Sequence, residues 1–385
     1  MSRPTDRDLR IDLLKGLALA MVFVDHVEAL LGVSVLSAWT LQTLGPSDAA
    51  ELFVLLSGIV VGRSYSRRMQ RSSFAATQLY AVRRVVTIYL AFVAVGTVAI
   101  LILKAAPAGV FDRPSMQPLI ESEWPGIIYR LATLQLIPFG FHFLPLYIVL
   151  LLFAPSVIWI LRRSLAAAVL PSAVLYIAVQ VLNGEQSGTW FAIQQKWMLN
   201  PLAWQFLFVL GLTAGSVWSR DVDRPLLMAF NRSPRWTLIA ICGAVMIAGW
   251  LLRHQEYVSE SWQYRPSGQL VVERLVDKPS LGVARLVHGV AVVCLLLVVL
   301  PPQAKCLGHR VARPLICCGQ NSLLVYTLSV LLAYAIVILL HRLGSDSLLV
   351  AFLELDALVV LCIAASVFEK WSAESSVRDV AGRLN

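Results

Sequence analysis

Charged side chains are scarce in this sequence. Asp, Glu, Lys and Arg make up 14% of the 385 residues, against about 25% in an average soluble protein. Hydrophobic residues make up 58%, and the mean hydropathy is +0.73. This composition excludes an ordinary soluble domain. It predicts an all-α, polytopic integral membrane protein that lies in a lipid bilayer.

Two nucleotide-binding motifs are missing. The chain contains neither a G-x-x-x-x-G-K-[ST] phosphate loop nor a G-x-G-x-x-G strand-helix unit, so nothing in it supports ATP-driven chemistry. The net charge of +9 does not indicate nucleic acid as a partner, because most basic residues belong to the loops expected on the cytoplasmic side.

Cysteines are few, and none lies in a predicted outer loop, so no structural disulfide is implied. The adjacent Cys317 and Cys318 do not have the spacing of a zinc site, and no metal is expected. All six lie in apolar segments or near their cytoplasmic ends: Cys242, Cys294, Cys306, Cys317, Cys318 and Cys362.

Apolar segments recur along the whole chain and predict about ten transmembrane helices in one domain, residues 1–385. The first is too long and too charged for the core of a signal peptide and has no cleavage site after it, so we expect the protein to retain it. The segments lie near residues 9–31, 47–62, 78–104, 139–161, 165–182, 200–219, 235–253, 281–301, 316–340 and 348–368.

Basic residues are concentrated in every second loop. The positive-inside rule therefore places both termini in the cytoplasm. The loops of the other set balance their basic residues with acidic ones: Asp112, Glu121, Glu123, Glu185, Glu256, Glu260, Glu273 and Asp277. The basic loops carry Arg63, Arg67, Arg68, Arg71, Arg83, Arg84, Arg162, Arg163, Arg220, Arg224, Arg232, Arg235, Lys305, Arg310 and Arg313.

The first apolar segment carries ionisable residues that a simple membrane anchor would not have: Asp12, Lys15, Asp25 and His26. Such residues are costly inside a span and indicate a functional site. At about 100° per residue, Lys15 and His26 lie within roughly 20° of the same helix face, about 16 Å apart. The segment therefore predicts a polar stripe across about half of the membrane.

The predicted outer loops are rich in aromatic residues. Two interpretations remain open, an aromatic belt at the membrane interface and a platform for sugar rings. The residues are Trp124, Tyr129, Trp190, Trp197, Tyr257, Trp262 and Tyr264.

Several short motifs resemble a known family. Lys15, ten residues and His26 resemble the basic-X10-His signature that opens the acyltransferase-3 superfamily, and Ser57-Gly58 resembles its second motif. Five other stretches are similar to OpgC-type proteins. These are G-P-S-D-A-A-E-L-F-V-L-L-S-G (45–58), L-P-L-Y-I-V-L (144–150), N-P-L-A-W-Q-F-L-F (200–208), A-R-L-V-H (284–288) and C-G-Q-N-S-L (318–323).

The resemblance implies transfer of an acyl group from cytoplasmic acyl-CoA to a sugar hydroxyl on the far side of a bacterial inner membrane. OpgC-type proteins include succinyltransferases of osmoregulated periplasmic glucans, so succinyl-CoA is the expected co-substrate and a periplasmic glycan the expected acceptor. Two departures bear on the acyl group and the acceptor. His142 and Phe143 stand where an acidic residue often precedes L-P-L-Y, and Ile59 stands where an aromatic often follows Ser-Gly.

Acyl transfer to a hydroxyl needs a base and a polar environment for the oxyanion. His26 is the candidate base, with an interfacial structural histidine as the alternative. Asp25, its neighbour, points about 100° away and would orient it poorly. Glu51 or Asp48 could fix the imidazole tautomer, although Asp48 is equally suited to cap a helix.

The donor and the acyl group need other contacts. Lys15 could line the route of the CoA arm, or it could pair with Asp12. Arg83 and Arg84 could hold CoA phosphates, although membrane topology also explains them.

Arg285, on one helix face with His288, could bind a succinyl carboxylate or could pair with Glu273 or another carboxylate. Other polar residues could line the substrate path or form ordinary interhelix hydrogen bonds: His142, Tyr147, Trp204, Gln205, Gln320, Asn321 and Ser322.

Two other functions remain open. Intramembrane charges also serve secondary transporters of sugars or carboxylates, but the chain has no evident inverted repeat. An O-acetyltransferase of another cell-envelope glycan would use the same chemistry with a different acyl group.

Overall fold

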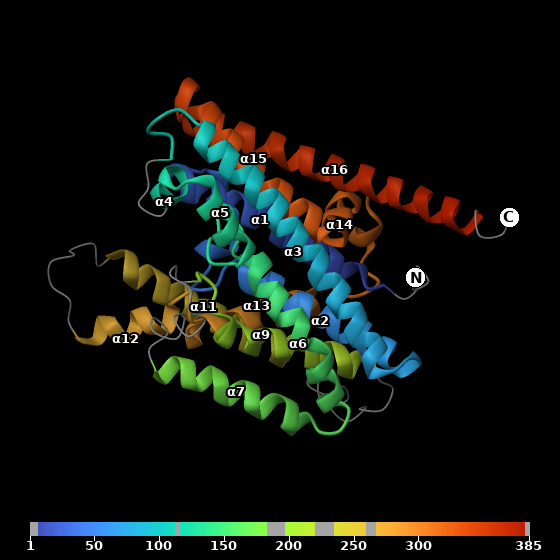
Figure 1. Cartoon of the computed structure of the whole chain (residues 1–385). Helices are drawn as coiled ribbons and strands as arrows, with labels where there is room; N and C mark the ends of the chain where they lie inside the picture. Colours follow the sequence, from blue (N-terminus) through green and yellow to red (C-terminus); the bar gives the residue numbers. More distant parts are fainter. Residues whose placement is uncertain (1–6, 112–115, 183–196, 220–234, 259–266, 382–385) are drawn as a thin grey trace. The chain divides into compact units, whose positions relative to one another are not determined.

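A computed structural model describes residues 7–111, 116–182, 197–219, 235–258 and 267–381, and in these ranges the regular secondary structure is helical (Figure 1). Contacts between Cα atoms divide the chain into two compact units. The terminal unit comprises residues 1–40 and 299–385, and the central unit comprises residues 41–298.

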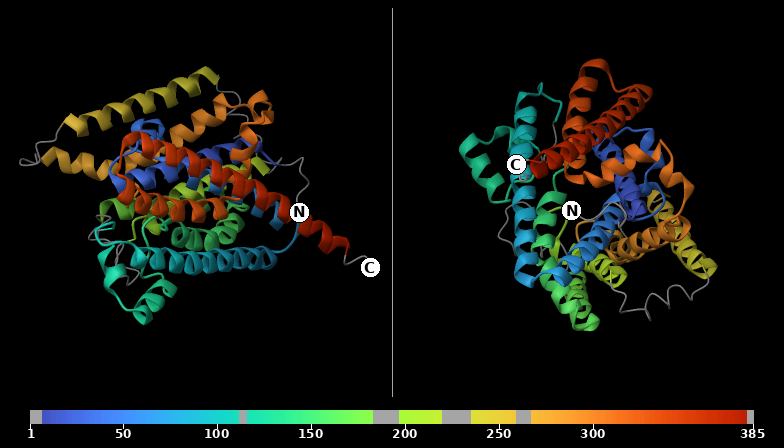
Figure 2. Two further views of the ribbon diagram at one scale, coloured as in Figure 1. Left: turned by 90° about the horizontal axis from the view of Figure 1, so that it is seen from above. Right: turned by 90° about the vertical axis from the view of Figure 1, so that its right-hand side faces the viewer.

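The terminal unit is built around α1. Asp8 caps this helix by accepting a hydrogen bond from the backbone N–H of Arg10, and Gly32 ends it with a φ of 76°. The helices of this unit are α1 (Leu9–Leu31), η2 (Leu36–Trp39), η5 (Lys305–Gly308), α14 (Ala312–Gln320), α15 (Ser322–Leu343) and α16 (Ser347–Ala381). Figure 2 shows α16 as one long helix that leads to the C-terminus.

Two glycines allow α1 and α14 to pack closely. A Cβ atom on Gly16 would collide with the carbonyl of Leu315, and one on Gly319 would collide with the carbonyl of Asp12. The backbones therefore approach more closely than larger residues would permit. This packing fixes the polar stripe of α1 beside the end of α14.

The central unit packs α2 against α9, with α3 against α6 and α7 against α9. Close contact between α2 and α9 again depends on glycine, because a Cβ atom on Gly58 would meet Phe208 and Gly211. The helices are η3 (Leu41–Thr43), α2 (Ala49–Arg71), α3 (Phe74–Ala105), α4 (Gln117–Glu121), α5 (Trp124–Ala132), α6 (Phe143–Leu161), α7 (Leu165–Val181), α9 (Pro201–Ser219), α11 (Arg235–Val258), α12 (Ser267–Val276) and α13 (Val283–Val299).

The helices agree with the predicted all-α membrane protein. Among the described residues, seven helices are long and apolar enough to cross a membrane, and two shorter apolar helices, α7 and α13, accompany them. The predicted number of ten and the predicted orientation stay predictions. Several expected side chains lie outside the described ones: Asp112, Glu185, Trp190, Arg220, Arg224, Arg232, Glu256, Tyr257, Glu260, Trp262 and Tyr264.

Some helix boundaries differ from the predicted ones. The segment near 316–340 is two helices, since α14 ends at Gln320 and α15 begins at Ser322. Helix α2, expected to end near residue 62, continues to Arg71. Its last turns are rich in Arg, which has high helix propensity, so the helix outlasts its apolar stretch.

Candidate functional site

Asp12, a member of the polar stripe on α1, has several hydrogen-bond partners. Its carboxylate accepts hydrogen bonds from Arg7, at 2.6 Å from Nε and 3.1 Å from Nη2, and from Gln320 Nε2 at 3.2 Å. The side chain is buried. Of the residues predicted to line the substrate path, Gln320 thus reaches the stripe itself.

The other two stripe residues, Lys15 and His26, are half-buried along α1, as is Asp25, which points to a different face. The imidazole ring of His26 lies 6.4 Å from the ring of Tyr326 on α15, measured between centroids, at an interplanar angle of 59°. The candidate base is therefore positioned by two helices of the terminal unit. Its role in catalysis stays a prediction.

Asn321 and Ser322 close the break between α14 and α15. Asn321 Nδ2 donates to the carbonyl of Cys317 at 3.0 Å, and Ser322 Oγ donates to the carbonyl of Gly319 at 2.6 Å. The carbonyl of Cys317 also accepts the backbone N–H of Asn321, so the two side chains add hydrogen bonds to carbonyl groups at the end of α14. These contacts match ordinary hydrogen bonding, the alternative considered for these two residues.

A buried ionic cluster occupies one end of α2 in the central unit. Arg285 on α13 donates from Nε to Glu51 Oε1 at 2.7 Å and from Nη2 to Asp48 Oδ2 at 2.9 Å. Lys278 Nζ lies 2.6 Å from the same Asp48 oxygen. Glu51 is 0% exposed. Arg285 therefore pairs with carboxylates other than Glu273, which was one of the alternatives predicted from the sequence.

Asp48 and Glu51 also form a capping box at the start of α2. Asp48 Oδ1 accepts from the N–H of Ala50 at 2.8 Å, and Glu51 Oε2 accepts from the N–H of Asp48 at 2.9 Å. The capping alternative for Asp48 is therefore confirmed. Both oxygens of Glu51 have partners within the central unit, and a role for either carboxylate in orienting His26 stays a prediction.

Electrostatics keep Asp48 ionised. Burial alone would raise its pKa, but the cations of Lys278 and Arg285 outweigh burial and hold the pKa of Asp48 below its usual value. Sequence reasoning did not identify Lys278 as a functional residue. Its place in the short loop of residues 277–282, just before a predicted span, is the only signal that the sequence offers for it.

His288 lies next to this cluster on α13. Its Nδ1 is 2.7 Å from Ser47 Oγ, and the ring is 1% exposed. The ring packs against Gly45 and Gly249, where a Cβ atom would collide with it. Arg285 and His288, predicted to share a helix face, therefore both face the segment around the start of α2.

The predicted residues at the ends of α6 and α9 have varied partners. Burial, with a further contribution from the Lys278 cation, lowers the pKa of His142 to about 4, so its ring is neutral near pH 7. Trp204 Nε1 donates to the carbonyl of Lys278 at 3.2 Å. Gln205 exchanges hydrogen bonds with Ser172 on α7, which is an ordinary interhelix contact.

Arg83 and Arg84 are exposed on α3. Arg84 is close enough to Tyr65 and Tyr147 for electrostatic interaction. Tyr147 on α6 packs between two aromatic rings, with centroid distances of 5.9 Å to Phe53 and 6.3 Å to Phe208.

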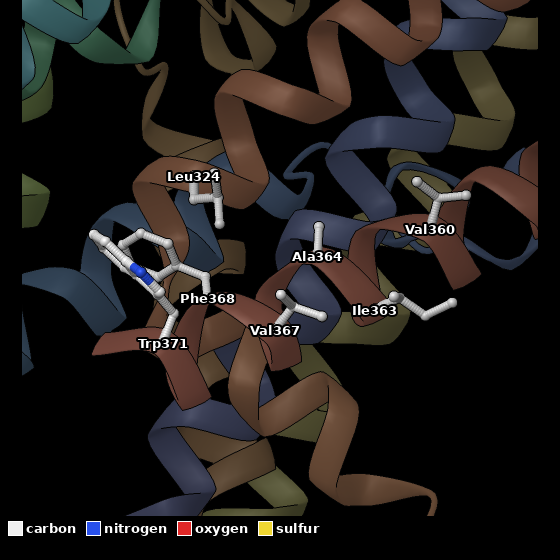
Figure 3. Close-up of a pocket in the computed structure, with 7 residues that line it drawn as sticks. All are labelled: Leu324, Val360, Ile363, Ala364, Val367, Phe368 and Trp371. Carbon is white, nitrogen blue, oxygen red and sulfur yellow. The ribbon is translucent and has the colours of Figure 1, made fainter. Parts of the chain in front are cut away.

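An apolar groove runs along α16 in the terminal unit (Figure 3). Its lining is hydrophobic throughout and includes none of the predicted site residues, as expected of a surface that faces lipid. The lining residues are Leu324, Val360, Ile363, Ala364, Val367, Phe368 and Trp371. Among the described residues, no group of three or more His, Cys, Asp or Glu side chains could hold a metal ion.

Apolar helices with ionisable groups buried among them define a multi-pass membrane protein with a polar interior. The family described as OpgC protein matches residues 7–373, and the chain belongs to this family. No curated protein and no solved structure matches the chain. Family and helices together indicate a membrane-embedded acyltransferase of the OpgC type.

Proposed function

We propose that this protein transfers a succinyl group from cytoplasmic succinyl-CoA to a hydroxyl of a periplasmic glycan, such as an osmoregulated glucan, from within a bacterial inner membrane. The observation that carries the proposal is the polar stripe on α1, with Lys15 and His26 inside the region that matches the OpgC family. Ionisable residues are costly inside a membrane span, so a helix that only anchors the protein would not be expected to contain them.

In this proposal His26 is the general base. It takes the proton of the acceptor hydroxyl, the hydroxyl oxygen attacks the thioester carbonyl carbon, and the C–S bond breaks to release CoA. A route through an acyl-histidine uses the same residue as a nucleophile. Its packing with Tyr326 supports a defined ring orientation for either route.

The donor would be held by cations. Arg83 and Arg84 are exposed on α3, where guanidinium groups suit the phosphates of CoA. Lys15, half-buried in α1, would line the route of the pantetheine arm. Both assignments require the predicted orientation, with these residues reached from the cytoplasm.

The choice of succinyl rests on the resemblance to OpgC-type succinyltransferases. Arg285 already binds the carboxylates of Glu51 and Asp48, so it would bind a succinyl carboxylate only by exchanging one of them. Comparing transfer from succinyl-CoA with transfer from acetyl-CoA therefore tests which acyl group the protein uses.

The test uses the purified protein in lipid vesicles with labelled succinyl-CoA, an oligoglucan and no ion gradient. We expect CoA release and a labelled glucan. The His26→Ala variant should lose activity by about 10²-fold to 10⁴-fold, the usual contribution of a general base. The matched control is His309→Ala, because His309 is exposed in a loop of the terminal unit and should retain full activity.

Two outcomes would contradict the proposal. One is full transfer activity in the His26→Ala variant. The other is uptake of sugar or succinate that needs an ion gradient and consumes no thioester, which would identify a transporter. Faster transfer from acetyl-CoA than from succinyl-CoA would show that the acyl group is acetyl. The proposed reaction class, acyl transfer, would stay unchanged.

A further inference from the structure

Two buried hydroxyl groups in the central unit, Ser57 Oγ and Tyr147 Oη, make no hydrogen bond to the backbone or to any side chain other than each other. Elsewhere in the helices, hydroxyls bond to their own backbone, as Thr87 does to the carbonyl of Arg83 and Thr97 to that of Val93. Ser57 Oγ and Tyr147 Oη are buried without such a bond. A buried polar group without a full set of hydrogen bonds is destabilising, so the burial of these two hydroxyls requires an explanation.

The two hydroxyls face one another from neighbouring helices. Ser57 is 4% exposed on α2, and Tyr147 Oη on α6 points toward it. Phe53, one turn before Ser57, and Phe208 on α9 hold the tyrosine ring between them. The phenol is therefore fixed in place, and its oxygen has little freedom to find another partner.

The sequence around Ser57 explains this arrangement. Gly58 follows Ser57, and its missing side chain lets α9 approach until the carbonyl of Phe208 fills the space of a Cβ atom. Close packing of α9 brings the Phe208 ring onto Tyr147. Ser57 thus supplies one hydroxyl donor. Gly58 allows the helix contact that places Phe208 against Tyr147, the second donor.

The depth of the pair suits the reactive end of a donor molecule. Ser57 is eight residues past the start of α2, which is about 12 Å along the helix axis and well inside a hydrocarbon core of about 30 Å. Arg84 on α3 interacts electrostatically with Tyr147. Arg84, the cation proposed to bind CoA phosphates, therefore acts on one of the two hydroxyls within the central unit.

We propose that Tyr147 Oη and Ser57 Oγ donate hydrogen bonds to the carbonyl oxygen of the donor thioester. When the acceptor oxygen bonds to the carbonyl carbon, the C=O π electrons move onto this oxygen, and the two O–H groups stabilise the resulting oxyanion. When the C=O bond reforms, the C–S bond breaks, and CoA leaves as a thiolate that takes up the proton removed from the acceptor hydroxyl. This inference rests on the proposed function.

Neutral donors at this depth fit a carbonyl better than they fit a phosphate or a carboxylate. Preorganised O–H groups act on charge that develops only in the transition state, and they act strongly in a water-excluded site. A third unpartnered hydroxyl, Thr213 on α9, has no role in this proposal.

The test compares Tyr147→Phe with wild type in the vesicle assay. The substitution removes one oxygen and keeps the packed ring. We expect kcat to fall roughly 10²-fold to 10³-fold, as after loss of one oxyanion donor, with KM for succinyl-CoA nearly unchanged. Ser57→Ala should also lower kcat.

The matched control is Tyr176→Phe. Tyr176 is also buried in the central unit, but its hydroxyl donates to the carbonyl of Leu281 at 2.8 Å. Its loss should lower the melting temperature and leave kcat unchanged. A second readout is the infrared C=O stretch of bound succinyl-CoA without acceptor, which should lie at lower frequency in wild type than in Tyr147→Phe.

The outcomes separate the two proposals. A wild-type protein that consumes no acyl-CoA would overturn the proposed function. An active wild type with an unchanged kcat and an unchanged C=O stretch in Tyr147→Phe would overturn this inference alone. A variant that loses activity only in proportion to lost folded protein would overturn it as well.

Discussion

Arg285 shows how a buried charge is accommodated in this protein. Its guanidinium lies between Glu51 and Asp48, and Lys278 adds a second cation beside Asp48. Charges of both signs are thus matched where solvation by water is poor. Removing one partner of a buried pair leaves an uncompensated charge, which is strongly destabilising.

We therefore expect Arg285→Leu to lower the free energy of unfolding by about 3–5 kcal/mol, the range for a broken buried pair. The double variant Arg285→Leu with Glu51→Gln should recover part of this loss, because it also removes the carboxylate charge. Thermal unfolding in detergent measures both. Equal melting temperatures for wild type and Arg285→Leu would show that the pair does not stabilise the fold.

Single residues could be predicted from the sequence where the signal is local. The stripe of Lys15 and His26 follows from helical spacing, and the cap at Asp48 follows from its place before an apolar run. The pairing of Arg285 with Glu51 joins residues 234 positions apart, and spacing along one helix carries no information about it. The orientation of Tyr147 toward Ser57 was missed for the same reason.

Helix identity could be predicted better than helix ends. Apolar runs located α1, α6, α7, α9 and α13 to within a few residues. The break at Asn321 was missed although the short polar run from Gly319 to Ser322 interrupts the apolar segment there. It depends on hydrogen bonds from side chains to carbonyl groups at the end of α14.

Glycine contacts explain how α1 and α14 hold together, and they make a prediction at this scale. Gly16→Ala should lower the melting temperature, because the new methyl group would overlap the carbonyl of Leu315; overpacking typically costs about 1–3 kcal/mol. The control is Gly243→Ala on α11, where no atom beyond the local helix backbone lies within 4 Å of the added Cβ. It should be neutral or stabilising, since alanine has higher helix propensity. Equal effects of the two substitutions would contradict the packing argument.

At the scale of the whole molecule, the charge distribution decides which side of the membrane each loop occupies. The positive-inside rule predicts a cytoplasmic loop around Lys305, Arg310 and Arg313. Cys306 is exposed in this loop, and the other cysteines are buried or half-buried in helices. One native thiol can therefore report the orientation.

We expect a membrane-impermeant maleimide to label Cys306 in inside-out vesicles but not in intact cells with a permeable outer membrane, and Cys306→Ser should remove the signal. The opposite side is tested by Trp39→Cys in the Cys306→Ser background. Trp39 is 82% exposed in a predicted outer loop, so this variant should label from outside. Labelling of Cys306 from outside would reverse the predicted orientation. In the reversed orientation Arg83 and Arg84 could not be reached by cytoplasmic acyl-CoA. This result would therefore also contradict the proposed donor site.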